Sequence, residues 1–441
     1  MLPSIFRKVE MIMKLNTKRT ILVGMAFLSI CTFWQMYDAV IPLILKNTFH
    51  VGDTNSGMIM ALDNVLALFM LPLFGNLSDK TDTRFGKRTP FIVIGTAAAC
   101  LFTLLIPVAD QLGIFWMFIV ALLLVLISMS VYRSPAVALM PDLTPKPLRS
   151  KGNAIINLMG AVGGMITLVL IQVLVPGHTT RPNYFPLFSA VAVIMAVSVV
   201  LLVSTIPEKR LAAEATALSG PEEPEKEPVQ GKEKSEPLPK DVKKSLIFLL
   251  LSVAFWFMGY NAVTSAFSKY AQIQWGMAGG SFASSLLVAT GAAVLSYIPV
   301  GIVATRIGRK KTILVGVAVL ALCFFSGALF PSYHPAVNIV FALVGISWAA
   351  INVNSYPMVV EMSQGGSVGK FTGYYYTFSM AAQIFTPILS GALLEHVGYW
   401  TLFPYAALFS ALAFVTMLFV RHGDSKPMPA KSRLEAFDTP D

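Results

Sequence analysis

Twelve long apolar stretches, separated by short polar segments, make up most of this chain. They span approximately residues 20–45, 56–77, 90–108, 113–136, 153–175, 184–206, 246–268, 281–303, 312–331, 336–358, 373–394 and 399–420. Each stretch is close to the ~20 mostly apolar residues that an α-helix needs to cross a lipid bilayer. The pattern therefore predicts an all-α membrane protein with twelve transmembrane helices.

A polar stretch at residues 207–245 divides the predicted helices into two groups of six. It contains P-E-E-P-E-K-E-P and shows no apolar periodicity, so it cannot bury enough surface to fold by itself. We therefore predict a first six-helix bundle over residues 1–206 and a disordered cytoplasmic linker over 207–245. A second bundle over 246–420 and a cytoplasmic tail over 421–441 complete the chain.

The composition supports lipid as the main solvent of the chain. Hydrophobic residues make up 55% and charged residues only 13%, whereas about 25% charged is usual in soluble domains.

The three cysteines, Cys31, Cys100 and Cys323, all lie in apolar stretches. We expect them to be packing residues, with neither a disulfide framework nor a zinc cluster. No motif for metal binding or a nucleophile is apparent, so we predict neither an enzyme nor a metal or organic cofactor.

Lysine and arginine are distributed unequally between the two sides of the predicted bundle. With both termini inside, only Lys46, Arg181 and Lys269 fall in outer loops and Arg133 lies within a helix, while the other 29 of the 33 basic residues lie in inner loops and tails. Cytoplasmic loops retain positive charge, so the asymmetry predicts cytoplasmic termini in a plasma (inner) membrane. The net charge of +10 then reflects orientation in the bilayer, not nucleic-acid binding.

The first apolar stretch follows a basic N-terminal segment, as the start of a secretory signal peptide would. It holds Trp34, Tyr37 and Asp38 and lacks a small-residue cleavage site. These features favour a retained first helix over a signal peptide.

Two loop motifs recur at corresponding places in the two halves. The sequence G-N-L-S-D-K-T-D-T-R-F-G-K-R (75–88) follows the second predicted helix, and G-I-V-A-T-R-I-G-R-K-K (301–311) follows the eighth. Near the ends of the fourth and tenth helices, S-P-A-V-A-L-M-P-D-L-T (134–144) corresponds to S-Y-P-M-V-V-E-M-S (355–363). The chain therefore contains an internal repeat.

The repeated loops predict a conformational latch, which can break and re-form as the two halves rock. Glycine allows two helices to approach closely, while acidic and basic side chains form charge-assisted bonds and engage helix ends. Thr305 replaces the acid in the second copy, so we expect the stronger latch in the first half. The predicted latch residues are Gly75, Asp79, Lys80, Arg84, Gly86, Lys87, Arg88, Asp142, Arg149, Gly301, Arg306, Gly308, Arg309 and Glu361.

The first loop motif resembles the signature of the major facilitator superfamily, whose carriers rock two six-helix bundles about a central site. The runs M-L-P-L-F-G-N-L-S-D-K-T-D-T-R-F-G-K-R-T-P-F-I (70–92) and P-D-L-T-P-K-P-L-R-S-K-G-N-A (141–154) are similar to stretches of plant sucrose transporters and their animal solute-carrier relatives. The similarity covers the twelve-helix chain, with its specific motifs concentrated in the first half. It implies a sugar and proton symporter related to the glycoside-pentoside-hexuronide carriers.

Departures from this resemblance bear on the coupling ion and on the sugar site. The sodium-linked melibiose branch carries two carboxylates where this chain has Ala67 and Leu71. A melibiose-type sodium site is therefore not expected, and the proton is the expected coupling ion. In the sucrose branch a basic residue stands where this chain has Val137, whereas Arg133 lies one turn earlier on the same helix face.

Two acids are embedded in apolar helices and are candidates for carrying the coupling proton. Asp38 and Asp63 each lie about 11 Å from the outer end of their helix, as the helix rise gives. An intramembrane carboxylate costs ~3 kcal/mol or more unless it is neutralised or partnered, so it is by default a functional candidate. The alternative is a structural contact with a polar neighbour such as Asn64 or Gln35.

The third buried charge is Arg133, which lies about 12 Å from the inner end of the fourth helix and near the midplane of a ~30 Å core. We predict that it pairs with Asp38 across the cavity and is released by protonation of Asp38 to bind sugar hydroxyls. The alternative is a fixed salt bridge that holds helices together.

A sugar site needs aromatic faces for C–H patches and amides or guanidinium groups for hydroxyls. The same residue types also bridge helices and anchor interfaces, and an interfacial belt is the expected role of the tyrosines at 374–376. The candidate sugar-binding residues are Trp34, Gln35, Tyr37, Asn64, Arg133, Asn261, Trp348, Asn352, Asn354, Tyr356 and Gln383.

Taken together, these patterns predict a monomeric carrier that imports a disaccharide or glucoside with protons by alternating access. Its expected partners are the small-molecule sugar and the lipid bilayer. An efflux carrier of the same fold for amphipathic compounds is the alternative, and a largely apolar cavity without converging amides would favour it. A sensor without transport activity would need a soluble signalling domain, which neither the linker nor the tail supplies.

Overall fold

The computed structural model describes residues 15–145, 148–177, 182–219, 239–363 and 368–424. Twelve of its helices are long and apolar enough to cross a membrane, as the sequence predicts. In the first half these are α2 (Thr17–Asn47), α3 (Asp53–Lys80), α4 (Thr89–Leu112), α5 (Phe115–Leu143), α6 (Arg149–Leu174) and α7 (Phe185–Thr205). In the second half they are α9 (Lys240–Ile273), α10 (Ala283–Ile307), α11 (Arg309–Ala328), α12 (Val337–Glu361), α13 (Val368–His396) and α14 (Leu402–Leu418), which follows the short helix η2 (Tyr399–Thr401).

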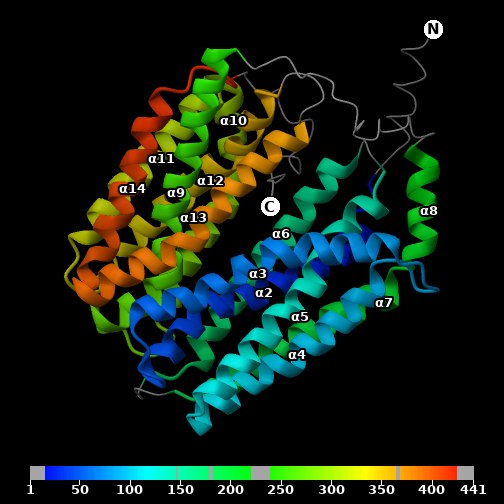
Figure 1. Ribbon diagram of the computed structural model, residues 1–441, viewed down its shortest axis with the longest axis horizontal. Coiled ribbons are helices and arrows are strands. Elements are labelled where there is room, and N and C mark those ends of the chain that lie inside the picture. The colour runs from blue at the N-terminus through cyan, green and yellow to red at the C-terminus, as the bar shows by residue number, and fades with distance from the viewer. Residues whose placement is uncertain (1–14, 146–147, 178–181, 220–238, 364–367, 425–441) are drawn as a thin grey trace.

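The two halves form separate bundles that meet at one end of the molecule and diverge at the other (Figure 1). Contacts between them are made by α3 with α13, α6 with α10 and α2 with α9. The latch loops lie at the diverging end, which we call the open end. The opposite end, where α3 begins and α13 finishes, is called the closed end.

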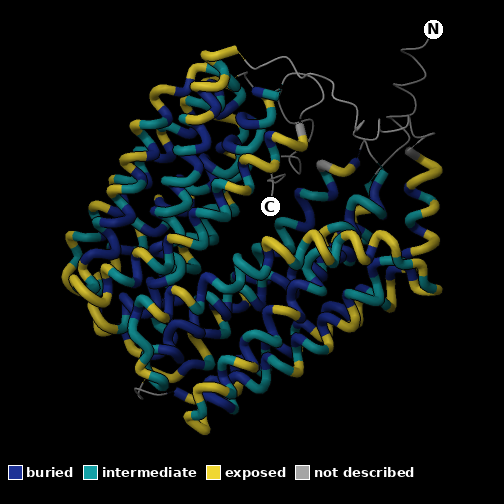
Figure 2. Tube along the Cα trace, viewed as in Figure 1, coloured by how far each residue is buried: buried dark blue, intermediate teal, exposed yellow. Residues whose placement is uncertain are grey.

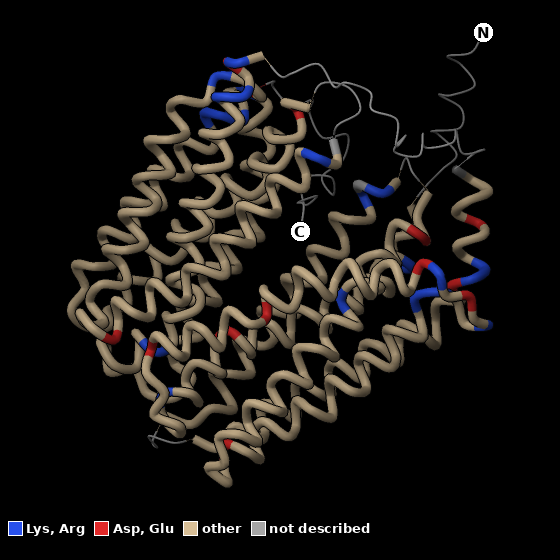
Figure 3. Tube along the Cα trace, in the orientation of Figure 1, with Lys and Arg blue, Asp and Glu red and all other residues tan. Residues whose placement is uncertain are grey.

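Lysine and arginine gather at the open end (Figure 3). The described parts of the predicted inner loops therefore lie on one side of the bundle. Large apolar side chains such as Leu295, Val173 and Trp116 are 70–79% exposed, and exposed positions run along the outer faces of the helices (Figure 2). Such surfaces are expected where a helix faces lipid.

Glycines allow the close helix approaches that hold the bundles together. A Cβ atom on Gly163 of α6 would collide with the backbone carbonyl of Leu28 on α2, and one on Gly57 of α3 would collide with that of Pro387 on α13. The first contact lies within one half, and the second joins the two halves at the closed end. Small residues serve this purpose in membrane bundles because backbone packing drives association there.

The expected disordered linker at 207–245 needs correction, because part of it is helical. Helix α8 (Glu208–Ser219) follows α7, and α9 begins five residues before residue 245. Leu211 and Ala215, one turn apart, are buried against the first half, so this short stretch has an apolar face that the linker prediction overlooked. The Glu208 carboxylate also accepts backbone N–H bonds at the start of α4. Residues 220–238 lie outside the described part of the chain.

Candidate functional site

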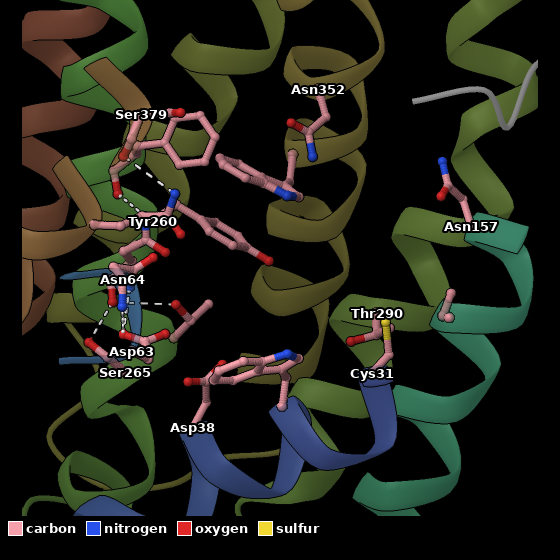
Figure 4. A pocket seen from close by; sticks show the side chains of 18 of the residues that line it. Cys31, Asp38, Asp63, Asn64, Asn157, Tyr260, Ser265, Thr290, Asn352 and Ser379 are labelled. Carbon is pink, nitrogen blue, oxygen red and sulfur yellow. Dashed lines mark hydrogen bonds between the residues drawn. The ribbon is translucent and has the colours of Figure 1, made fainter. Parts of the chain in front are cut away.

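A cavity of about 660 Å³ lies between the two halves. It is lined by α2, α3, α5 and α6 of the first half and by α9, α10, α12 and α13 of the second. In Figure 4, Asp38 comes from α2, Asn157 from α6 and Asn352 from α12, and their side chains surround one common space. The volume falls in the usual range for small-molecule sites, about 300–1,000 Å³.

The structure brings most of the predicted site residues to this cavity. Those that line it are Trp34, Asp38, Asp63, Asn64, Arg133, Asn261, Trp348, Asn352 and Gln383. Four other predicted residues, Gln35, Tyr37, Asn354 and Tyr356, do not line it. Because each residue of a helix is rotated by about 100° from the one before, a neighbour of a cavity residue commonly faces elsewhere.

Tyr37 and Asn354 are corrected because both are packed into the protein interior. Tyr37 is 1% exposed, and its ring packs against Phe33 and edge-on to Trp34 at 5.4 Å between centroids. Asn354 is 2% exposed, and its Nδ2 donates to the backbone oxygen of Ala350 at 2.9 Å. Neither side chain is presented to a ligand in the cavity.

Gln35 and Tyr356 are also corrected, because each faces another helix. The amide oxygen of Gln35 lies close to Gly164 of α6, 3.6 Å from the position that a Cβ atom would take there. The hydroxyl of Tyr356 shares a 3.1 Å hydrogen bond with Thr372 of α13. Both residues therefore join helices within a half.

The first half supplies all the charged groups among the residues that line the cavity. Asp63 accepts hydrogen bonds from the backbone N and the Nδ2 of Asn64, at 2.6 and 2.7 Å. Its negative charge acts on Asp38, and the positive charge of Arg133 acts on Asp63. With both acids ionised and Arg133 protonated, the three groups carry a net charge of −1. Among the described residues, no group of three or more His, Cys, Asp or Glu side chains could hold a metal ion.

The predicted ion pair between Asp38 and Arg133 is not formed. Among the described residues, Asp38 makes no hydrogen bond or ion pair, and the guanidinium of Arg133 lies over the ring of Trp34 at 5.8 Å from its centroid. A guanidinium over an indole face is a cation–π contact. Trp34 therefore takes the place next to Arg133 that the prediction gave to Asp38.

The second half supplies an uncharged, aromatic and amide-rich wall. The rings of Tyr260 and Trp348 stack in parallel, with 3.7 Å between centroids and 5° between planes, and Phe257 meets Trp348 edge-on. Asn261 donates its Nδ2 to the backbone oxygen of Phe257 at 2.9 Å, which leaves its amide oxygen as an acceptor. This wall can stack on an apolar surface and bond hydroxyl groups at the same time.

Several lining residues were missed by sequence reasoning. They are Asn157, Tyr260, Thr264, Ser265, Thr290, Tyr297, Tyr375, Tyr376 and Ser379. Tyr260 stands directly before Asn261 and close to one turn before Thr264, a polar cluster in an apolar helix that could have indicated it. Tyr375 and Tyr376 correct the expected interfacial belt, since both line the cavity and Tyr375 is 4% exposed with its hydroxyl on Ser355.

The first copy of the latch is centred on Arg88, which is 4% exposed. Its guanidinium pairs with Asp79 on α3 and with Asp142 on α5, the latter at 2.8 Å, and also bonds Ser78. Lys87 reaches Asp142 at 3.2 Å. These bonds join α3, α4 and α5 of one half, so the latch braces the first bundle and does not bridge the two halves.

The second copy is smaller, in keeping with Thr305 in place of the acid. Arg309 pairs with Glu361 at 2.6 Å and joins α11 to α12. Two other predicted latch residues lie apart from both centres: the guanidinium of Arg84 lies over the ring of Phe85, and Arg149 donates to the nearby backbone oxygen of Thr144. Within the part of the chain that the structure describes, Gly75, Lys80, Gly301 and Arg306 form no part of either ion-pair network, although Gly75 offers its backbone oxygen to Arg88.

Two acids that the sequence analysis missed complete this repeat. Glu208 accepts bonds from the backbone N–H groups that begin α4, and Asp424 accepts one from Lys310 N at 2.7 Å in the first turn of α11. Each carboxylate lies against the glycine before that helix, Gly86 and Gly308, whose φ angles are +121° and +94°. The positive φ favours glycine, and the absent Cβ leaves room for the acid.

Comparison with known proteins agrees with this architecture. The family model described as Major Facilitator Superfamily matches residues 23–294 and 279–440. A search of curated proteins found no significant match.

Solved structures of similar fold include the nucleoside transporter NupG, with 16% identity and a TM-score of 0.66 over 92% of this chain and all of that one. A POT family transporter in complex with 5-aminolevulinic acid has 12% identity and a TM-score of 0.68 over 91% of this chain and 95% of that one. The POT family transporter PepTSo has 10% identity and a TM-score of 0.65 over 93% and 98% of the two chains. At these identities the likeness concerns the fold. With two bundles, a cavity between them and a family model that covers nearly the whole chain, this multi-pass membrane protein belongs to the Major Facilitator Superfamily and is a transporter, not an enzyme.

Proposed function

We propose that this transporter is a symporter that imports a disaccharide or glucoside together with protons. The observation that carries the proposal is how the two halves differ in the residues that they bring to the cavity. The acids Asp38 and Asp63 come from the first half, and the aromatic and amide wall comes from the second. The similarity of the 70–92 and 141–154 runs to sucrose transporters supports the same substrate class.

The second wall suits a sugar because it offers both kinds of contact that a pyranose needs. The stacked pair Tyr260 and Trp348 presents a flat apolar surface to C–H groups, while Asn261, Asn352 and Gln383 offer amides to hydroxyls. Five amide side chains converge on the cavity when Asn64 and Asn157 of the first half are included. This convergence favours sugar transport over the alternative of an efflux carrier, for which a largely apolar cavity is expected.

The charge balance of the cavity supports the coupling to protons. One proton on Asp38 or Asp63 brings the net charge of the three charged lining groups from −1 to zero. Charges are costly within a bilayer, so a site without net charge is easier to enclose while the halves move between the inward-open and outward-open states. Asp38 is the better candidate, because Asp63 is already bonded by Asn64.

We propose that the direction of transport is set by the orientation of the protein in the membrane together with an inward proton gradient. The basic open end faces the cytoplasm of a plasma (inner) membrane, in line with the positive-inside rule (Figure 3). In that orientation the described conformation is the inward-open one, and the cavity is loaded from outside once the closed end opens. No cofactor is proposed apart from the coupling proton.

Uptake into proteoliposomes tests the proposal. Labelled sucrose and maltose are offered separately, with and without an inward proton gradient, and a labelled amphipathic cation serves as the efflux probe. Accumulation of one of the sugars that requires the gradient is the expected result. Failure of both sugars under every gradient, together with extrusion of the cation, would replace the proposal with the efflux alternative.

A further inference from the structure

A buried charge cluster ties the two halves together at the closed end. Asp53, the first residue of α3, is 1% exposed. Its Oδ1 accepts a hydrogen bond from Lys269 Nζ of α9 at 2.8 Å, and its Oδ2 accepts bonds from Tyr399 Oη at 2.7 Å and from Lys46 Nζ of α2 at 3.1 Å. The carboxylate therefore has three donors, and Lys269 is itself 4% exposed.

These donors belong to different halves of the molecule. Lys269 and Tyr399 lie in the second half, whereas Lys46 lies in the same half as Asp53. If the halves separate at this end, the bond from Lys269 to Asp53 must break, but the bond from Lys46 to Asp53 can persist. The two lysines that contact Asp53 therefore differ in whether their bond survives separation of the halves.

Lys269 also has an acid within its own half. Glu395, near the end of α13, attracts Lys269 electrostatically. In this structure the Glu395 carboxylate accepts a 2.8 Å bond from the backbone N of Thr54, which is a second contact between the halves. Separation of the halves would break the bond from Thr54 to Glu395, and Glu395 would remain in the same half as Lys269, which it already attracts.

The cluster lies directly beyond the transport cavity. Met60, Ser265 and Pro387 line both that cavity and a small one that also reaches Lys269. The helices are shared as well, because α3 carries both Asp53 and Asp63 and α9 carries both Ser265 and Lys269. The cluster therefore closes the path from the cavity to the closed end.

We propose that Asp53 and Lys269 form the gate of the closed end and that this gate opens by an exchange of ion-pair partners. On opening, Asp53 keeps Lys46 and Lys269 turns to Glu395. Each charge then retains an opposite charge from its own half, which avoids the large penalty of leaving a buried ion without a partner. The gate is independent of the identity of the cargo.

The exchange predicts opposite roles for two lysines that contact the same carboxylate. Lys269→Gln removes a bond that exists only while the gate is closed, so it favours the open gate. Lys46→Gln removes the partner that Asp53 needs once the gate is open, so it favours the closed gate. The two substitutions make the same chemical change and serve as matched controls for one another.

Distances between spin labels at the closed end measure the gate without substrate and without assumptions about orientation. Leu112 at the end of α4 and Val397 after α13 are 61% and 54% exposed and lie in opposite halves. Both are changed to labelled cysteine in the full chain, after Cys31, Cys100 and Cys323 have been replaced by alanine. Double electron–electron resonance then gives the ratio of long to short distances.

Lys269→Gln is expected to raise this ratio at least about fivefold, the lower end of typical coupling between two states, whereas Lys46→Gln does not raise it. The proposal is overturned if both variants raise the ratio equally or if Lys269→Gln leaves it unchanged. Should Lys269→Gln not fold, Asp53→Asn removes the same bond between the halves and must raise the ratio. Because no sugar is present, a failure here is distinct from a failure of the proposed function.

Discussion

Asp38 and Arg133 face the same cavity from α2 and α5 without forming an ion pair, and the guanidinium lies instead over the ring of Trp34. The acid therefore remains accessible to a proton, and the arginine remains accessible to a ligand. A fixed salt bridge between them, which would serve only structure, does not occur in this state.

Arg133→Lys tests whether the guanidinium binds the cargo. Lysine keeps the charge but loses the planar fork that can bond two hydroxyls and the close stacking on Trp34. Loss of a hydrogen bond to a charged group is worth about 1.5–3 kcal/mol, so the KM for sugar should rise by roughly tenfold or more while coupling to protons persists. Kinetics of uptake in proteoliposomes measure this, and an unchanged KM and rate would exclude a binding role for Arg133.

Trp348→Ala tests the aromatic wall. Removal of the ring deletes the stacking surface and leaves Tyr260 without its partner at 3.7 Å. Aromatic contacts of this kind contribute about 0.5–1.5 kcal/mol beyond buried area, so sugar affinity should fall about tenfold. Trp348→Phe is the matched control and should retain most of the affinity. Calorimetric titration of the purified protein gives both values, and equal affinity in wild type and Trp348→Ala would remove the wall from the site.

The two latch copies should differ in their contribution to stability. Arg88 is buried and pairs with Asp79 and Asp142, so Arg88→Ala removes charge-assisted bonds to two carboxylates and should cost about 1.5–3 kcal/mol. Arg309→Ala breaks one partly exposed pair with Glu361 and should cost ~1 kcal/mol or less. Thermal unfolding in detergent compares the two, and equal losses of melting temperature would contradict the asymmetry.

Glu208→Gln should loosen the start of α4. The carboxylate accepts N–H bonds from Lys87, Arg88 and Thr89 at a helix N-terminus, where negative charge and capping together contribute about 1–2 kcal/mol. Hydrogen exchange of these amides should therefore accelerate, whereas Asp424→Asn should affect only the start of α11. Unaltered exchange in Glu208→Gln would show that the cap does not hold the helix end.

The twelve helices could be predicted because a chain in lipid must satisfy its backbone within each span, and helices of about 20 apolar residues do so. Which side of each helix faces the cavity was harder to predict. Asn352 faces the cavity. Asn354, two residues later, is buried, and its amide donates to the backbone oxygen of Ala350 in the same helix. In a helix that is apolar on all sides, sequence gives little indication of which side meets the ligand.

Contacts between distant segments were beyond sequence reasoning for a different reason. Lys46 and Lys269 were noted only as basic residues of the outer loops, yet both meet Asp53, and Lys269 is 216 positions away from it. Glu208 belongs to the stretch at 207–245, which was predicted to be a linker because it is rich in charges and prolines and has only one short apolar face. Such partners emerge only when the packing of the halves is known.

Coupling of sugar to protons at Asp38 is the central claim, and sugar-induced proton movement measures it most directly. Sugar is added to the outside of proteoliposomes that have no imposed proton gradient. The external pH is then followed for wild type, Asp38→Asn and the exposed control Asp241→Asn. The account predicts external alkalinisation with wild type and with Asp241→Asn, and sugar entry without proton movement with Asp38→Asn. Sugar entry into wild-type vesicles with no change in pH would contradict it.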